Sequence, residues 1–167
     1  TGVVGQKKAH VMADRLKKIN PQAEVTSIEE FYNAENCARI FETKPEFVVD
    51  AIDNLTAKSH LLSHCFTNNI PVITSGGAGS RLDPLQVTVC DLAETHTDPL
   101  LQQLRKILRT KYDFPREGAM GIPCVYSTEP YTEPYELKYD KGLGFKCVCP
   151  QGANNFHSCD RRSVIHG

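Results

Sequence analysis

Two aspartates, Asp50 and Asp53, follow an apolar run that begins at Phe47. Such a run is typical of a buried strand. In a parallel α/β sheet, the carboxyl ends of the strands face the ligand crevice. A short loop at that edge can present Asp50 or Asp53 to Mg²⁺, which prefers hard oxygen ligands and keeps most of its waters. Either aspartate can instead cap the helix that begins near Leu55, with Asn54 as a further cap candidate, and both interpretations stay open.

Two lysines stand at the start of the first expected helix, where Lys7 and Lys8 follow Gly5. Backbone N–H groups at a helix start favour anions, and a lysine adds a mobile positive charge for a phosphate. The alternative is a pair of solvated lysines on an exposed face. A phosphate-binding lysine together with a magnesium-binding carboxylate would indicate nucleotide chemistry.

Cysteine and histidine side chains offer a second kind of site. Four candidate zinc ligands lie in the last part of the chain: Cys147, Cys149, His157 and Cys159. Their spacing departs from the usual Cys-x-x-Cys, so a tetrahedral zinc site competes with an ordinary structural role for these residues. Cys124 would serve as a nucleophile only if a neighbour lowered the pKa of its thiol, and a packed cysteine at a strand start is favoured.

Helical and strand patterns alternate over the first part of the chain. We expect helices over residues 5–19, 34–42, 55–68 and 99–111, and strands over residues 24–28, 47–50, 70–74 and 85–89. This alternation predicts a Rossmann-like, mostly parallel sheet with helices on both faces. In the helix over residues 34–42, Ala38 and Phe41 are expected to turn inward. Residues 1–92 form the α/β part, and residues 93–167 add a helix and a loop-rich or β extension, whose prolines over 113–155 indicate loops and edge strands.

Composition favours one domain in a reducing compartment. The chain has 167 residues, 19 basic and 20 acidic side chains and a net charge of −1, so it has no global attraction for nucleic acid. Its seven cysteines do not suggest a disulfide framework. No apolar run reaches the ~20 residues of a membrane span. We expect a cytoplasmic fragment cut at both ends, in which an organelle-targeting signal could have been lost.

Several separated segments resemble the ubiquitin-activating-like adenylating enzymes, which include the molybdopterin and thiamine sulfur-carrier activators. These segments are residues 4–9 (VGQKKA), 15–21 (RLKKINP) and 50–54 (DAIDN). Within that superfamily, three more segments resemble the tRNA threonylcarbamoyladenosine dehydratases. They are residues 74–79 (TSGGAG) with 83–84 (DP), 91–100 and 124–129 (CVYSTE).

The resemblance implies a mechanism. ATP would activate the substrate carboxylate as an acyl-adenylate with release of pyrophosphate, and ring closure within the tRNA nucleoside would expel AMP. By position, Lys8 matches the family lysine that steadies the phosphates, and Asp53 matches the aspartate that holds Mg²⁺. Gln6 and Asn54 are the neighbouring candidates for nucleotide binding. The resemblance also implies a homodimer and a sulfur-relay protein partner.

The family pattern also contains a Gly-rich phosphate loop, an acidic ribose-binding residue and an arginine upstream of Lys8, and none of these is present. We therefore expect this chain alone to bind ATP weakly or not at all, and to be inactive. Alternative functions are adenylation of a ubiquitin-like or sulfur-carrier protein, against which the absence of Cys-x-x-Cys argues, and a non-catalytic interaction module. For tRNA, we consider five cations against a solvated helix face: Arg105, Lys106, Arg109, Lys111 and Arg116.

Overall fold

The computed structural model describes residues 5–130. The chain forms two compact units, residues 1–42 and residues 43–167. The division at residue 92 that the sequence suggests stays a prediction. The two units are described separately below.

The described part of unit 1, residues 5–42, contains two helices, α1 (Lys8–Ile19) and α2 (Ala34–Phe41). Helix α1 ends before Pro21, as expected from the extended conformation that a proline imposes on the residue before it. Helix α2 begins with a reciprocal cap: the Asn33 side chain accepts from the backbone N–H of Asn36, and the Asn36 side chain accepts from that of Asn33, both at 2.9 Å. Both helices were predicted, and both are confirmed.

Two details of unit 1 differ from the expectation. Residues 24–28 form no strand, because an extended segment becomes a strand only when a neighbour accepts its ladder hydrogen bonds. In α2, Ala38 is exposed, whereas Cys37 is 4% exposed and is the buried residue. A short helix buries a narrow stripe, and Ala38 lies a quarter-turn or so away from it.

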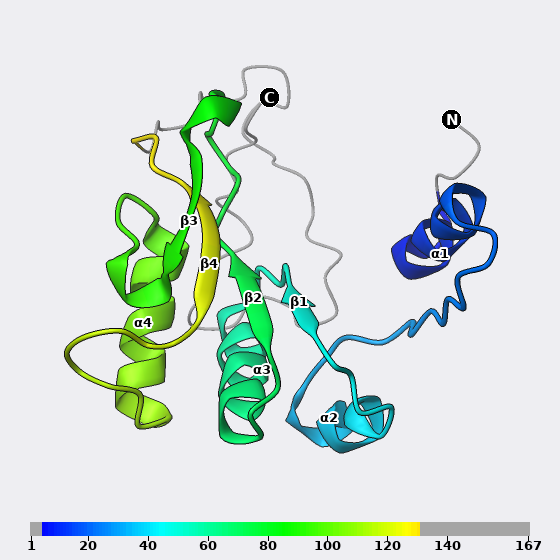
Figure 1. Ribbon diagram of the computed structural model, residues 1–167, viewed down its shortest axis with the longest axis horizontal. Coiled ribbons are helices and arrows are strands. Elements are labelled where there is room, and N and C mark those ends of the chain that lie inside the picture. Colours follow the sequence, from blue (N-terminus) through cyan, green and yellow to red (C-terminus); the bar gives the residue numbers. More distant parts are fainter. Residues whose placement is uncertain (1–4, 131–167) are drawn as a thin grey trace, which may run out of the picture. The chain divides into compact units, whose positions relative to one another are not determined.

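Within residues 43–130, unit 2 has a four-stranded sheet in the order β1-β2-β4-β3 (Figure 1). The strands are β1 (Val48–Asp50), β2 (Val72–Ser75), β3 (Val87–Asp91) and β4 (Pro123–Ser127). Strands β1, β2 and β4 are parallel, and β3 is antiparallel to β4, so the mostly parallel sheet is confirmed. Strand β4 lies inside the sheet. The expectation of loops and edge strands is therefore wrong there, and Pro123 is tolerated because it is the first residue of the strand.

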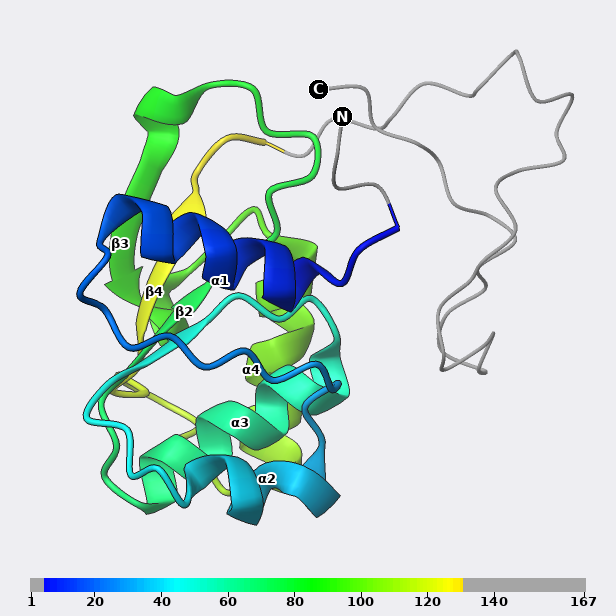
Figure 2. The same ribbon diagram turned by 90° about the vertical axis from the view of Figure 1, so that its right-hand side faces the viewer.

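The helices of unit 2 are α3 (Leu55–Thr67) and α4 (Pro99–Lys111), with short 3-10 turns η1 (Pro84–Gln86) and η2 (Leu92–Glu94) before and after β3. Both long helices lie on the same side of the sheet (Figures 1 and 2). The two helices contact each other, and four of their leucines have no exposed surface: Leu62 on α3, and Leu101, Leu104 and Leu108 on α4. Helices on the second face of the sheet stay a prediction.

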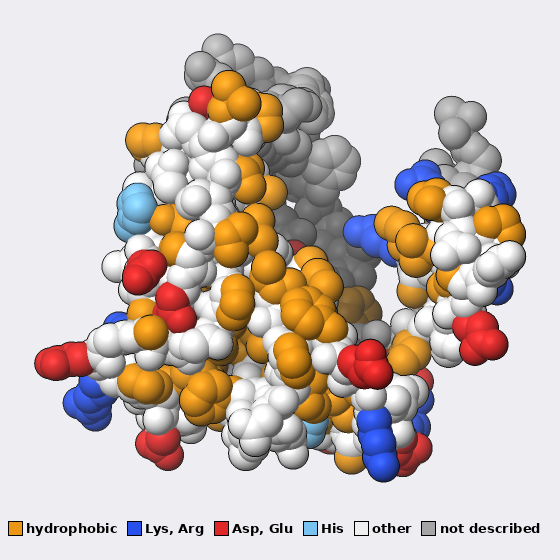
Figure 3. All heavy atoms as spheres, in the orientation of Figure 1, with side chains coloured by type: hydrophobic (Ala, Val, Ile, Leu, Met, Phe, Trp, Pro, Cys, Tyr) orange, Lys and Arg blue, Asp and Glu red, His pale blue; other side chains and the backbone are white. Residues whose placement is uncertain are grey.

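The other face of the sheet carries apolar side chains that remain exposed. Val49 on β1 is 74% exposed, and Val87 and Val89 on β3 are 54% and 59% exposed. Strand pairing places Val89 beside Val125 of β4, so these side chains share one face. Figure 3 shows hydrophobic side chains gathered over the strands on this side. The described core of unit 2 is thus one-sided.

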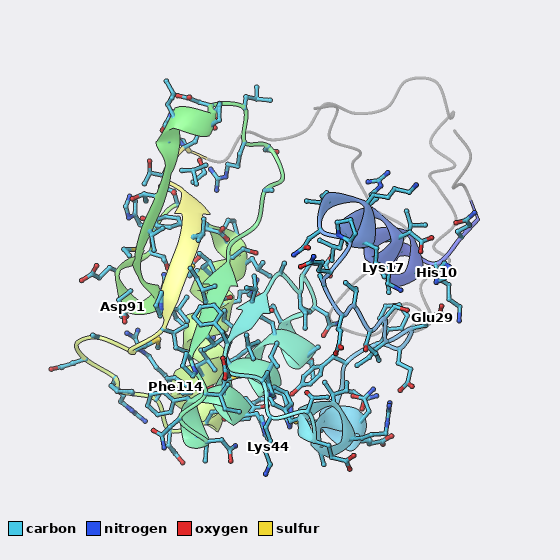
Figure 4. The ribbon with its side chains drawn as sticks, turned by 45° about the vertical axis from the view of Figure 1, so that its right-hand side comes forward. His10, Lys17, Glu29, Lys44, Asp91 and Phe114 are labelled. Atoms are coloured by element: carbon cyan, nitrogen blue, oxygen red, sulfur yellow. The ribbon has the colours of Figure 1, made fainter. Side chains whose placement is uncertain are left out.

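The loop that follows α4 is held at both of its ends (Figure 4). The Asp91 carboxylate accepts backbone N–H groups of Met120 at 2.8 Å and Gly121 at 2.7 Å. The Phe114 ring packs on the Phe66 ring of α3 with centroids 4.5 Å apart. These contacts fix the path of the chain through Arg116.

Candidate functional site

Three loops meet at the carboxyl edge of the parallel strands. Residues 51–54 follow β1, residues 76–83 follow β2 and residues 128–130 follow β4. Because β1, β2 and β4 are parallel, these loops leave the sheet at the same edge. Ligands of open α/β sheets bind in the crevice at this edge, so it is the candidate site.

Asp50 is committed to a buried ion pair and is not a free metal ligand. Its Oδ2 lies 2.8 Å from the Nζ of Lys58 on α3, and both side chains have no exposed surface. The Thr74 hydroxyl of β2 donates to the same Oδ2 at 2.6 Å, and the Ile52 N–H donates to Oδ1 at 3.0 Å. The expectation that Asp50 could serve a metal is therefore wrong: its lone pairs already join β1, β2 and α3.

Asp53 lies in the loop that this network supports. Its side chain is exposed. The residue before it, Ile52, is held by a hydrogen bond that its carbonyl accepts from Lys58 Nζ at 3.1 Å, and the residue after it is Asn54. Asn54 caps α3 by accepting the Ala57 N–H at 3.0 Å, which confirms the predicted cap. Since Asn54 and not Asp53 forms this bond, the capping interpretation of Asp53 loses its main support. An exposed carboxylate at this edge fits a magnesium ion that keeps its waters and phosphate ligands.

The glycine segment after β2 lets backbone and helix approach closely. The Gly76 N–H donates to the Val125 carbonyl at 2.8 Å, and the Gly77 N–H donates to Asp98 Oδ2 at 2.8 Å. Asp98 also caps α4 through the Leu101 N–H at 3.0 Å. A Cβ on Gly76 would lie 2.5 Å from Asp98 Oδ2, so a side chain does not fit there. Close packing explains this glycine without a phosphate.

Two charged residues of the edge were missed by sequence reasoning. Glu129 receives the backbone N–H groups of Leu82 and Asp83, at 2.9 and 3.1 Å, and so holds the third loop to the second. Arg81 donates from Nη2 to the Thr97 carbonyl at 2.8 Å. Its Nε and Nη1 are buried without a hydrogen-bond partner among the described residues. Glu129 ends the CVYSTE segment and Arg81 lies between the TSGGAG and DP segments, but their partners are distant in sequence, so only the tertiary structure reveals these contacts.

The remaining nucleotide candidates lie in unit 1. Lys8 is the first residue of α1 and is exposed, and Gln6 is exposed just before it. Lys7 pairs with Glu29 at 2.5 Å and is held within its own unit. That Gln6 and Lys8 act on the same nucleotide as Asp53 and Asn54 of unit 2 stays a prediction.

The sulfur candidates divide into two cases. Cys124 has no exposed surface, and burial raises the pKa of its thiol to about 12, so it is packed and unreactive, as favoured. Cys147, Cys149, His157 and Cys159 lie outside the described residues. Within residues 5–130, no three His, Cys, Asp or Glu side chains gather closely enough to hold a metal ion.

The buried Lys58 was also missed, although it carries the ion pair that shapes the edge. A lysine one turn after a helix cap usually signals a solvated face. The available signal was its place among apolar neighbours on α3, together with Asp50 at the end of an apolar strand. A lone buried lysine would need a partner, and Asp50 was the nearest carboxylate in sequence that could also be buried.

Comparison with known proteins agrees with this arrangement. The chain matches the ThiF family over residues 1–165. It is 41% identical over 133 residues to the tRNA threonylcarbamoyladenosine dehydratase of Escherichia coli, a match that covers 78% of this chain and 50% of that protein. The corresponding Haemophilus influenzae enzyme is 40% identical over 136 residues, which are 80% of this chain and 52% of that protein.

A solved structure shows the same fold. The Escherichia coli dehydratase in complex with ATP superposes with a TM-score of 0.75 at 41% identity, covering 78% of this chain and 55% of that one. The chain spans about half the length of the curated relatives that it matches. The family match extends over nearly the whole sequence, and the Rossmann-like fold agrees with it. The chain belongs to the ThiF family.

Proposed function

We propose that this protein acts in the ATP-dependent dehydration of threonylcarbamoyladenosine in tRNA. The observation that supports this most is the exposed Asp53 on a loop held by Asp50 and Lys58, in a chain 41% identical to a curated dehydratase. The reaction is inferred from the names of the relatives, and the loop places a carboxylate at the edge of the sheet where a nucleotide would bind.

Each candidate side chain has a defined task in this proposal. Asp53 would hold Mg²⁺, which screens the charge of the triphosphate, and Lys8 would neutralise phosphate oxygens. Gln6 and Asn54 would complete the contacts to the nucleotide. The substrate carboxylate attacks the α-phosphorus of ATP and releases pyrophosphate. The substrate's own nucleophile then attacks the activated carbonyl, the ring closes, and AMP leaves, so the nucleoside loses one water.

The experiment uses a chimera in which this chain replaces the matching segment of the Escherichia coli dehydratase. Purified chimera is incubated with ATP, Mg²⁺ and tRNA that carries threonylcarbamoyladenosine, and mass spectrometry follows the loss of one water. We expect turnover, and we expect Asp53→Ala to reduce its rate by about a hundredfold or more, because the developing phosphate charge loses its metal.

Glu46→Gln is the matched control, since Glu46 is an exposed carboxylate of the same unit that lies before β1, away from the carboxyl edge. It should leave the rate unchanged. A folded chimera that binds ATP yet leaves the nucleoside intact would contradict the proposal. Adenylation of a small carrier protein by that chimera would favour the alternative function. The absence of any Cys-x-x-Cys in the chain argues against that alternative.

The finer assignments are part of the same proposal. They are a ligase-type reaction, weak or absent ATP binding and no activity for this chain alone, a homodimer, a sulfur-relay partner and a cytoplasmic location. A zinc site at the four candidate ligands near the end of the chain also stays a proposal. Within residues 5–130, no helix has both the length and the apolar character needed to cross a bilayer.

A further inference from the structure

A basic hollow lies along the outer face of α4. Its volume is about 410 Å³, and it is lined by Gln102, Arg105, Lys106, Arg109, Thr110 and Arg116. The five helical residues recur every three or four positions, so they form one stripe, and the buried leucines of α4 face the other way. Arg116 joins them from the loop that Asp91 and Phe114 hold in place.

The positive charges of this hollow have no counter-charge in its lining. Arg105 donates to the Thr95 hydroxyl, and Arg109 donates from Nε to the Pro115 carbonyl at 3.1 Å, so both guanidinium groups are positioned by neutral acceptors. Burial and the neighbouring Arg109 charge lower the pKa of Arg105. In the described part of the chain, Lys106 and Arg116 have no ion pair, and both are exposed.

The lining of this hollow holds four cations and no carboxylate, and the Asp98 carboxylate of an adjoining hollow offsets part of the positive charge at Arg105. The positive potential that remains favours an anion. Fixed guanidinium groups match a phosphate group, because their planar N–H pairs can bind two of its oxygens. Side chains held by neutral acceptors have also lost part of their freedom before a ligand arrives, which lowers the cost of binding.

The hollow leads toward the candidate site. A second hollow of about 380 Å³ shares Gln102 and Arg105 with it and continues along Thr95–Pro99. Asp98, in this second lining, accepts the Gly77 N–H at the carboxyl edge of the sheet. A basic hollow and a more polar one therefore adjoin each other along α4, and the second includes Asp98, which contacts the glycine segment at the carboxyl edge of the sheet.

We propose that the Arg105, Lys106, Arg109 and Arg116 hollow binds backbone phosphates of the RNA substrate and guides the target nucleoside toward the carboxyl edge. This inference rests on the proposed function for the identity of the RNA. The near-neutral net charge of −1 makes a local site, rather than the whole surface, responsible for binding.

The test measures binding of a fluorescein-labelled, unmodified tRNA transcript to the 167-residue chain by anisotropy between about 50 and 200 mM salt. Lys106→Gln and Arg116→Gln should each flatten the slope of log K against log salt by about one, and the double variant should weaken binding by about tenfold. Arg116→Lys should retain most of the binding. Circular dichroism and thermal melting check that every variant keeps its fold.

Lys111→Gln is the matched control. It removes one positive charge from the same helix, and Lys111 does not line the hollow. It should leave the slope unchanged. Equal losses in Lys106→Gln, Arg116→Gln and Lys111→Gln, no binding by the unaltered chain, or equally strong competition by poly-glutamate of matched charge would overturn the inference.

The two proposals fail separately. The transcript lacks the modified nucleoside, so its binding does not depend on the reaction. If tRNA binding depends on salt, Lys106 and Arg116 but the chimera leaves the nucleoside unchanged, the RNA-binding inference stands and the proposed dehydratase function is rejected. Turnover of the chimera with no binding defect in these variants would do the reverse.

Discussion

At the scale of single residues, the aspartate that ends β1, Asp50, and the aspartate in the loop after it, Asp53, differ in burial. Asp50 is buried between Lys58 and Thr74, whereas Asp53 is exposed and lacks the helix-capping bond, which Asn54 makes. Charge burial decides this division, because a buried carboxylate must be paired and hydrogen-bonded, and an exposed carboxylate is free to bind a cation. Asp50 and Lys58 thus support the loop, and Asp53 is the residue that a ligand can reach.

Lys58→Met tests this support. Removing the ammonium leaves the Asp50 carboxylate buried with only neutral donors, so we expect a loss of about 3–5 kcal/mol in the free energy of unfolding. Urea denaturation followed by circular dichroism measures it. Lys111→Met, which removes an exposed lysine, should change stability by less than about 0.5 kcal/mol. A loss below about 1 kcal/mol for Lys58→Met would mean that the pair is not the constraint described above.

At the scale of elements, the start of α4 and the glycine segment after β2 are one structural unit. Asp98 receives the Gly77 N–H and the Leu101 N–H, so the same carboxylate caps the helix and holds the segment. Gly76 is needed because the Asp98 carboxylate occupies the place of a side chain. The first turn of α4, and with it Arg105 and the hollow, is thereby tied to the edge of the sheet.

Gly76→Ala and Gly77→Ala form a matched pair for this contact. The added Cβ of Gly76→Ala would meet Asp98 Oδ2 at 2.5 Å and two apolar carbons at 3.0 Å, which predicts a loss of about 1–3 kcal/mol. The nearest atom to a Cβ on Gly77 is 3.8 Å away, so Gly77→Ala should cost less than about 1 kcal/mol. Thermal melting compares the two. Equal melting temperatures would show that the contact yields without cost.

At the scale of the whole molecule, unit 2 has its described core on one side. Leu104 of α4 has no exposed surface, whereas Val89 on the opposite face of the sheet is 59% exposed. Apolar burial therefore stabilises mainly the layer between the sheet and the pair α3 and α4.

Truncation of one residue from each side tests this asymmetry. Leu104→Ala should lower the free energy of unfolding by about 2–5 kcal/mol, because it removes buried methyl groups and leaves a cavity. Val89→Ala should cost about 1 kcal/mol or less, since most of that side chain already contacts solvent. Urea denaturation of both variants supplies the comparison. Similar losses would reveal a second buried layer over β3.

The sequence by itself determined the local features. Apolar spacing predicted the bounds of α1, α3 and α4 to within a few residues. The residue type at position 54 predicted that Asn54 caps α3, and the alternation of elements predicted the mostly parallel sheet. Local propensity and short-range hydrogen bonds produce these features, so a linear pattern contains them. The ordered motifs likewise indicated the family that the chain matches.

The tertiary structure alone decided what depends on pairing between distant segments. It placed β4 inside the sheet, left residues 24–28 without a strand, and gave Asp50 a buried lysine as its partner. It also gathered the cations of α4 and Arg116 around one hollow. Each outcome depends on which segment supplies a hydrogen-bond partner or a counter-charge, and residues far apart in sequence settle that only when the chain has folded.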